Sequence, residues 1–178
     1  MMATTFRIEG GSLRIAFAIV VPLMAAVLQA SLVPFIAVGG ARPNVPLLVA
    51  GAWSVSAGAG EGVWWAFFGG LGADLLSGGP LGAFAASTLP PVAAIGLGER
   101  APARPTPVLV AAALIGIAAL AAALLYVALL AIVGQPLPSL PTLVVDAVSG
   151  ALYTAVLGIV VYPVLRGVRA LSEKESPF

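Results

Sequence analysis

Two aspartates, Asp74 and Asp146, lie inside strongly apolar stretches of this 178-residue chain. A carboxylate in apolar surroundings is costly unless it has a partner, so each of them predicts a binding site or a paired basic group. Two facing aspartates could supply the acid and base of an intramembrane protease, and one alone could bind a proton or a cation. Alternatively, an ion pair with Arg42 would neutralise one of these carboxylates, and that aspartate would then have a structural role only.

The surrounding sequence argues against catalysis. Asp74 ends the segment Gly-Leu-Gly-Ala-Asp, whereas intramembrane aspartyl proteases have Gly-x-Gly-Asp, and no Tyr-Asp pair is present. The chain contains no cysteine and no histidine, which excludes disulfides, thiolate ligands and the commonest general base. Phosphate-binding loops and metal-ligand clusters are absent from the sequence. We therefore predict a protein that is not an enzyme and uses no metal and no cofactor.

The composition predicts that the lipid bilayer is the solvent for most of the chain. Hydrophobic residues make up 61% and charged residues only 8%, whereas a soluble domain carries about a quarter charged residues. We expect a single integral membrane domain over residues 1–178, with short cytoplasmic tails at about 1–12 and 167–178. A single lysine accompanies seven arginines, so no polybasic patch for nucleic acid exists.

The apolar pattern predicts an all-α membrane protein with six transmembrane helices. A span needs about 20 apolar residues, so the second and third helices, which are shorter, must be shielded by their neighbours. Pro90 and Pro91 predict a kink or a break in the fourth helix. The expected spans are 13–33, 45–60, 63–76, 81–97, 107–133 and 140–165.

Basic residues predict the orientation. With a cytoplasmic N-terminus, the cytoplasmic side carries Arg7, Arg14, Arg100, Arg104, Arg166, Arg169 and Lys174, and the outer side carries Arg42. Both termini are therefore expected in the cytoplasm. A cleaved signal peptide is the alternative for the first span, but its apolar run exceeds the usual stretch of about 7–15 residues.

Residues 69–82, Gly-Gly-Leu-Gly-Ala-Asp-Leu-Leu-Ser-Gly-Gly-Pro-Leu-Gly, predict a tight helical hairpin. Its small residues allow close helix packing, and Pro80 suits the start of the next helix. Asp74 lies near the outer, negative end of its helix and needs a donor. We expect that Arg42 pairs with Asp74, or that both residues engage the turn backbone and a partner protein. Separate extension of the two charged side chains to the lipid headgroups is the alternative.

Other polar residues have simpler expectations. Asp146 lies about two turns into the sixth span, and its expected partner is Arg42 or a polar group of a neighbouring helix. A proton or cation site is the sharper alternative for this aspartate. Glu61 is expected in a solvated loop, and Trp64 and Trp65 are expected in an aromatic belt at the inner membrane interface.

Two segments resemble the family of the rod shape-determining protein MreD. Residues 41–49, Ala-Arg-Pro-Asn-Val-Pro-Leu-Leu-Val, are similar to its Arg-Pro-Asp-Leu segment, although Asn44 stands where the family usually has aspartate. Residues 69–82 are similar to its Gly-x-x-x-Asp-Leu-x-Ser-x-x-Pro-x-Gly hairpin. Together with Asp146, the residues expected to fix structure or contact a partner are Arg42, Pro43, Asn44, Gly70, Asp74, Ser77, Gly78, Gly79, Pro80 and Gly82.

The resemblance implies a non-catalytic scaffold subunit of the elongasome, the cell-shape machinery for peptidoglycan synthesis, in the bacterial cytoplasmic (inner) membrane. Its implied partners are an MreC-like bitopic membrane protein and, directly or indirectly, RodA with a class B penicillin-binding protein. A scaffold of this kind should expose close-packed, glycine-rich faces to a partner helix.

The fold of MreD proteins is similar to that of the substrate-binding subunits of energy-coupling-factor transporters, so a vitamin-transport subunit is the alternative. Such a subunit should enclose a polar, vitamin-sized pocket near the outer face. The polar residues available to line it are Gln29, Arg42, Asn44, Asp74, Ser77 and Asp146. An ion-coupled carrier ranks last, because the chain offers two apolar-embedded acids and no internal repeat.

Overall fold

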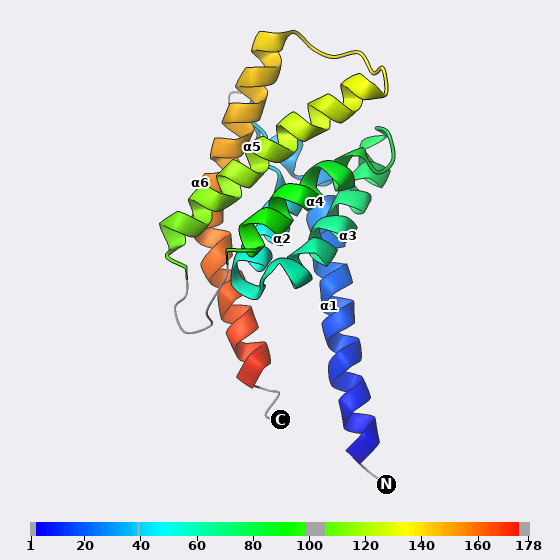
Figure 1. Cartoon of the computed structure of the whole chain (residues 1–178), viewed down its shortest axis with the longest axis vertical. Coiled ribbons are helices and arrows are strands. Elements are labelled where there is room, and N and C mark those ends of the chain that lie inside the picture. The colour runs from blue at the N-terminus through cyan, green and yellow to red at the C-terminus, as the bar shows by residue number, and fades with distance from the viewer. Residues whose placement is uncertain (1–2, 39, 99–105, 175–178) are drawn as a thin grey trace.

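The computed structural model describes residues 3–38, 40–98 and 106–174, and the side chains of 15–38, 40–98 and 106–171. These residues form six α-helices and no β-strand, which confirms the predicted all-α architecture (Figure 1). The elements are α1 (Ala3–Ser31), the 3-10 helix η1 (Val33–Phe35), α2 (Val45–Ala57), α3 (Ala59–Ser77), α4 (Ala83–Gly96), α5 (Val108–Ile132) and α6 (Leu140–Lys174).

Several helix boundaries differ from the sequence expectation. Helix α1 begins at Ala3 and α6 continues to Lys174, so most of both expected tails is helical. Helix α4 begins at Ala83 and continues as one helix through Pro90 and Pro91, so of the two expected forms, a kink or a break, the break is wrong. Hydroxyl groups brace α4 on both sides of the prolines: Thr88 Oγ1 donates to the carbonyls of Phe84 and Ala85, and Ser54 Oγ of α2 donates to that of Val92.

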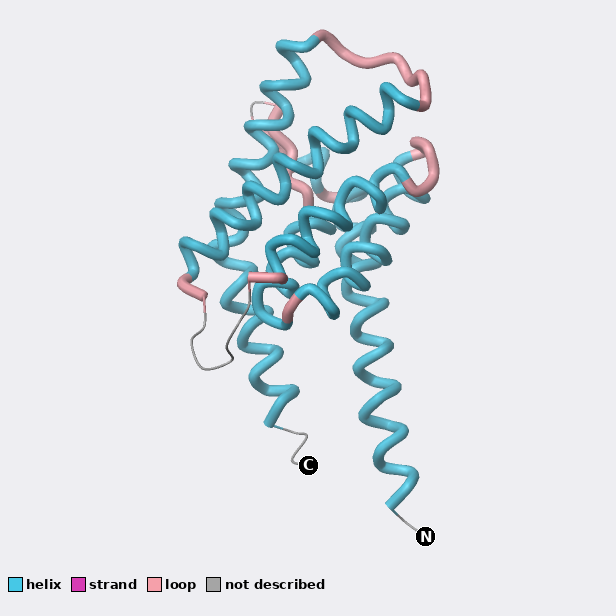
Figure 2. Tube along the Cα trace, in the orientation of Figure 1, coloured by secondary structure: helices cyan, strands magenta, loops and turns pink. Residues whose placement is uncertain are grey.

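The short helix α2 lies at the centre of the bundle, where it contacts all five other helices. Ten of its 13 residues are buried. The expectation that short helices are shielded by neighbours is confirmed for α2, because the surrounding helices supply the apolar environment that a longer span would take from lipid. The N-terminal end of α1 and the C-terminal end of α6 lie at the same end of the molecule, and the α5–α6 loop lies at the opposite end (Figures 1 and 2).

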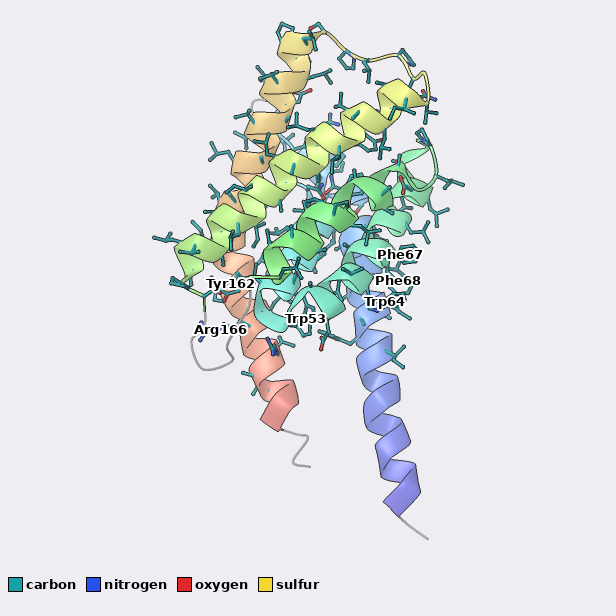
Figure 3. All side chains as sticks on the ribbon, in the orientation of Figure 1. Trp53, Trp64, Phe67, Phe68, Tyr162 and Arg166 are labelled. Carbon is teal, nitrogen blue, oxygen red and sulfur yellow. The ribbon has the colours of Figure 1, made fainter. Side chains whose placement is uncertain are left out.

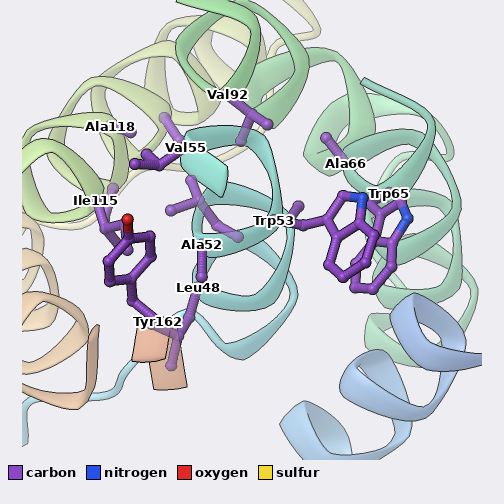
Figure 4. Close-up of a cluster of buried hydrophobic side chains, with 14 of the residues drawn as sticks. Leu48, Ala52, Trp53, Val55, Trp65, Ala66, Val92, Ile115, Ala118 and Tyr162 are labelled. Carbon is purple, nitrogen blue, oxygen red and sulfur yellow. The ribbon is translucent and has the colours of Figure 1, made fainter. Parts of the chain in front are cut away.

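Two stacked tryptophans and several alanines fill the core. The rings of Trp53 in α2 and Trp65 in α3 are parallel within 5°, with centroids 4.3 Å apart (Figure 4). Trp65 is only 1% exposed, so its expected place in an interfacial belt is wrong, whereas Trp64 is 59% exposed. Successive positions of a helix point in different directions, which sends one tryptophan inward and the other outward.

Helices α5 and α6 have the length and composition of membrane-crossing segments, over Val108–Ile132 and Leu140–Leu171. The described part of α1, with α2 and α4, forms shorter apolar helices. Large apolar side chains cover the outside of α6 at intervals of four residues: Leu140, Val144, Val148, Leu152, Val156, Val160 and Val164 are all exposed. An apolar outer surface of this kind suits contact with lipid or with another apolar helix.

Candidate functional site

Asp74 caps the start of α4 across the α3–α4 hairpin. Its Oδ2 accepts hydrogen bonds from the backbone N–H groups of Gly82 (3.0 Å) and Ala85 (3.1 Å), and its Oδ1 accepts one from Phe84 (2.9 Å). The first amides of a helix have no partner within the helix and carry its positive partial charge. The carboxylate is 2% exposed, so these three donors replace the water that it loses on burial.

Glycines shape the hairpin around this cap. Gly78 ends α3 with φ +68° and Gly82 precedes α4 with φ +87°, a backbone region that favours glycine. A Cβ on Gly70 would lie 2.5 Å from the Cα of Ala85, so only glycine permits this approach of α3 to α4. Ser77 Oγ donates to the carbonyl of Asp74 (3.2 Å) and accepts from the N–H of Gly79 (3.4 Å).

The expected ion pair between Arg42 and Asp74 is wrong. In the described part of the chain, every donor to Asp74 is a backbone amide. Of the alternative expectation, the part that concerns Asp74 is confirmed, because its carboxylate engages the backbone of the hairpin. The pair is unnecessary because the positive end of α4 already offers three N–H groups to the carboxylate.

The segment around Arg42 begins α2. Pro43 is fully buried, and the side chain of Asn44 is the N-cap of α2, its Oδ1 accepting from the N–H of Leu47 (3.1 Å). The N–H of Asn44 itself donates to Thr154 Oγ1 of α6 (3.0 Å), and Gln29 Oε1 of α1 accepts from the N–H of Val45 (2.8 Å). Three helices therefore meet at this turn.

A cavity of about 200 Å³ lies beside this turn, between α1, α4, α5 and α6. Four of the six polar residues expected in an outer pocket line it: Gln29, Arg42, Asn44 and Asp146. Asp74 and Ser77 do not, so the structure does not bring the two aspartates into one site. The remaining lining residues are Pro43, Phe84, Ser87, Ala119, Ala122, Ala123, Tyr126, Ala147, Gly150, Ala151 and Thr154.

The two charged residues of the cavity have unused side chains. Among the described residues, neither the guanidinium of Arg42 nor the carboxylate of Asp146 forms a hydrogen bond or an ion pair, so the expected pairing of these two is wrong as well. Ser149, three residues after Asp146 in α6, donates to the carbonyl of Val145 in its own helix. No three His, Cys, Asp or Glu side chains gather into a metal site in the described residues.

Sequence reasoning missed several residues of the cavity. Thr154 could have been found, because Asp146, Gly150 and Thr154 follow one another at intervals of four and share one face of α6. Tyr126 is a single polar side chain in the long apolar run of α5, and nothing in the sequence connects it with α1 or α6. Phe84 lies against it, with ring centroids 5.9 Å apart.

Glu61 also differs from expectation. It lies in the first turn of α3 rather than in a loop. Its Oε2 accepts a hydrogen bond from the indole N–H of Trp53 (2.9 Å). An acidic residue at a helix start is favoured by the helix dipole, so Glu61 orients the stacked tryptophan and stabilises α3 at once.

Comparison of the chain with models of known families, with curated proteins and with solved structures finds no match.

Proposed function

We propose that the chain is a six-span protein of the bacterial cytoplasmic membrane, with both termini in the cytoplasm, and that it is a non-catalytic assembly subunit of the MreD type. The six helices, with both described ends at the same end of the molecule, support an even number of crossings. The apolar exteriors of α5 and α6 support a bilayer as the surrounding medium.

The observation that carries this proposal is the use made of the residues that resemble MreD. Asp74 caps α4 and Asn44 caps α2. Asparagine and aspartate are about equally good N-caps, so Asn44 performs this role although the family usually has aspartate there. The distinctive polar residues thus fix helix geometry, which suits a scaffold better than a catalyst.

The glycine-rich faces, expected to receive a partner helix, contact helices of the chain itself. A Cβ on Gly72 of α3 would lie 2.9 Å from Ala26 of α1, and one on Gly116 of α5 would lie 2.7 Å from Ala155 of α6. A partner must therefore use another face. The exposed apolar side chains of α6 described above fit the transmembrane helix of an MreC-like bitopic protein, through which RodA and a class B penicillin-binding protein would join.

The cavity gives a reason to keep a second candidate, the substrate-binding subunit of an energy-coupling-factor transporter. It contains four of the polar residues expected of such a pocket. Its volume of about 200 Å³ is nevertheless below the range of about 300–1,000 Å³ typical of pockets for drug-sized ligands. A vitamin is of that size, so the cavity volume favours the scaffold.

Co-purification from native membranes in mild detergent tests the proposal. We expect an MreC-like bitopic protein to be recovered with the wild-type chain, and to be lost from Leu152→Trp, which adds bulk to the exposed face of α6. Val20→Trp, at an exposed apolar position of α1, is the matched control and should retain the partner. Recovery of an ABC-type ATPase with its transmembrane coupling subunit would instead identify the transport subunit.

A further inference from the structure

We propose that the cavity beside Arg42 binds a small zwitterionic group, in which a phosphate or carboxylate is joined by a short spacer to an ammonium. The headgroup of phosphatidylethanolamine has this chemistry, and so do soluble phosphoethanolamine compounds. The inference rests on the residues that line the cavity and is independent of which protein partner the chain assembles with.

The turn that begins α2, which borders the cavity, presents hydrogen-bond donors. A backbone N–H can only donate, so the side-chain atoms that accept from Val45 and Leu47 must be the oxygens of Gln29 and Asn44. The NH2 groups of these two amides are therefore the free ends. Neither NH2 group has a hydrogen-bond partner among the described residues. Every buried side-chain nitrogen in that part of the chain does have one. The two NH2 groups are therefore accessible from outside the protein.

Arg42 adds a positive charge to the same turn. It is one of the residues that line the cavity, and its guanidinium carries five N–H donors in a planar fork that matches a phosphate or a carboxylate. Asn44 is the N-cap of α2, so the positive end of that helix dipole also lies at this turn. Two amides, a guanidinium and a helix start together favour an anion beside this turn.

Asp146 makes a simple anion the wrong ligand. Asp146 lines the same cavity from α6, and its carboxylate forms no ion pair with Arg42. A lone phosphate would leave this negative charge without a partner, whereas a ligand that also carries an ammonium satisfies both charges. Because Arg42 and Asp146 come from different elements and form no ion pair, a ligand bridging them gains both interactions without first breaking one.

The size and the walls of the cavity agree with a headgroup-sized ligand. A volume of about 200 Å³ equals roughly seven water molecules at about 30 Å³ each. The remaining wall is mostly apolar and small, with alanines of α5 and α6 beside Phe84 and Tyr126. This wall suits the methylene groups of a short spacer.

Native mass spectrometry of the full chain in detergent tests the proposal, with phosphatidylethanolamine and phosphatidylglycerol as probes. Arg42→Ala should weaken binding of phosphatidylethanolamine about tenfold or more, because it removes a charge-assisted interaction. Asp146→Asn should abolish the preference for phosphatidylethanolamine over phosphatidylglycerol, which lacks the ammonium. Arg166→Ala is the control, since Arg166 is an exposed residue of α6 about 30 Å from Asp146 by the helical rise (Figure 3).

Soluble glycerophosphoethanolamine distinguishes the two sources of the ligand. If it displaces the lipid at equal concentration, the site takes a free zwitterion; if the lipid binds more than tenfold more tightly, the site takes a lipid headgroup. Either result supports the proposal. Equal binding of the two lipids by the wild-type chain would overturn it, as would Arg42→Ala and Asp146→Asn variants that bind phosphatidylethanolamine as well as Arg166→Ala does.

Discussion

The two aspartates embedded in apolar sequence have opposite surroundings. Asp74 is 2% exposed, and its two oxygens accept from three backbone N–H groups. Asp146 is exposed and lines a cavity that it shares with an equally unpaired Arg42. The hairpin carboxylate has its donors within the chain, so it stabilises the fold. The cavity carboxylate has none among the described residues, so it is available to a ligand.

The same contrast applies to the two turns. The α3–α4 turn uses glycine, serine and aspartate to satisfy its own backbone, and it leaves no side-chain charge free. The turn before α2 uses the oxygens of Gln29 and Asn44 in the same way, but among the described residues their NH2 groups and Arg42 have no partner. Whether the polar groups of a turn are satisfied internally therefore separates a structural element from a candidate binding site.

Removal of the hairpin carboxylate should have the largest effect on stability. Asp74→Ala leaves three helix-start amides without an acceptor, and we expect a loss of about 3–5 kcal/mol in the free energy of unfolding. Asp74→Asn keeps one acceptor oxygen and should lose less. Unfolding by denaturant in detergent measures both. An Asp74→Ala variant as stable as the wild-type chain would show that these bonds do not hold α4.

Disruption of the close contact between α3 and α4 at Gly70 should have the second-largest effect on stability. A Cβ on Gly70 would lie 2.5 Å from backbone of α4, so Gly70→Ala should cost roughly 1–3 kcal/mol of unfolding free energy. Gly60→Ala on the same helix, where no atom lies within 4 Å of the added Cβ, should be neutral or stabilising by up to about 1 kcal/mol. Equal effects of the two substitutions would argue against close packing at Gly70.

The cap of α2 should have a smaller effect. Asn44→Ala removes the acceptor for the N–H of Leu47 and should cost about 1 kcal/mol. Asn44→Asp keeps that acceptor and should leave the unfolding free energy nearly unchanged. A large loss in Asn44→Asp would mean that the amide NH2 group, rather than the oxygen, is the stabilising end of this side chain.

Loss of the cavity carboxylate should have the smallest effect on stability. Asp146 is exposed, and its carboxylate has no partner in the described part of the chain, so Asp146→Ala should change the unfolding free energy by no more than about 0.5 kcal/mol. A loss comparable with that of Asp74→Ala would remove the distinction between the two aspartates.

Much of the fold could be predicted from the sequence, because apolar length and glycine-proline turns are local signals. The existence of all six helices, the hairpin and the need of Asp74 for a donor followed from such signals. The outward direction of Trp65 and a break at Pro90 were predicted wrongly, since neighbouring helices decide which face is buried and brace a proline-containing helix. Tertiary packing overrides both local rules.

The site was less accessible from sequence. The sequence identified Arg42 and Asp146 as unusual charges, but pairing was assigned by membrane side alone, which contains no information on distance. The donors to Asp74 are backbone N–H groups, which every residue except proline carries, so the pattern of residue types cannot identify them. The cavity also requires Tyr126 and Thr154, which approach Arg42 only through long-range packing of α5 and α6.

The most direct measurement is the thermal unfolding midpoint of Asp74→Ala and Asp146→Ala in one detergent, without and with phosphatidylethanolamine. We expect Asp74→Ala to unfold well below the wild-type chain but to keep the stabilisation by the lipid. We expect Asp146→Ala to unfold near the wild-type midpoint but to lose that stabilisation. The reverse pattern, or equal behaviour of the two variants, would contradict the assignment of one aspartate to the fold and the other to a ligand.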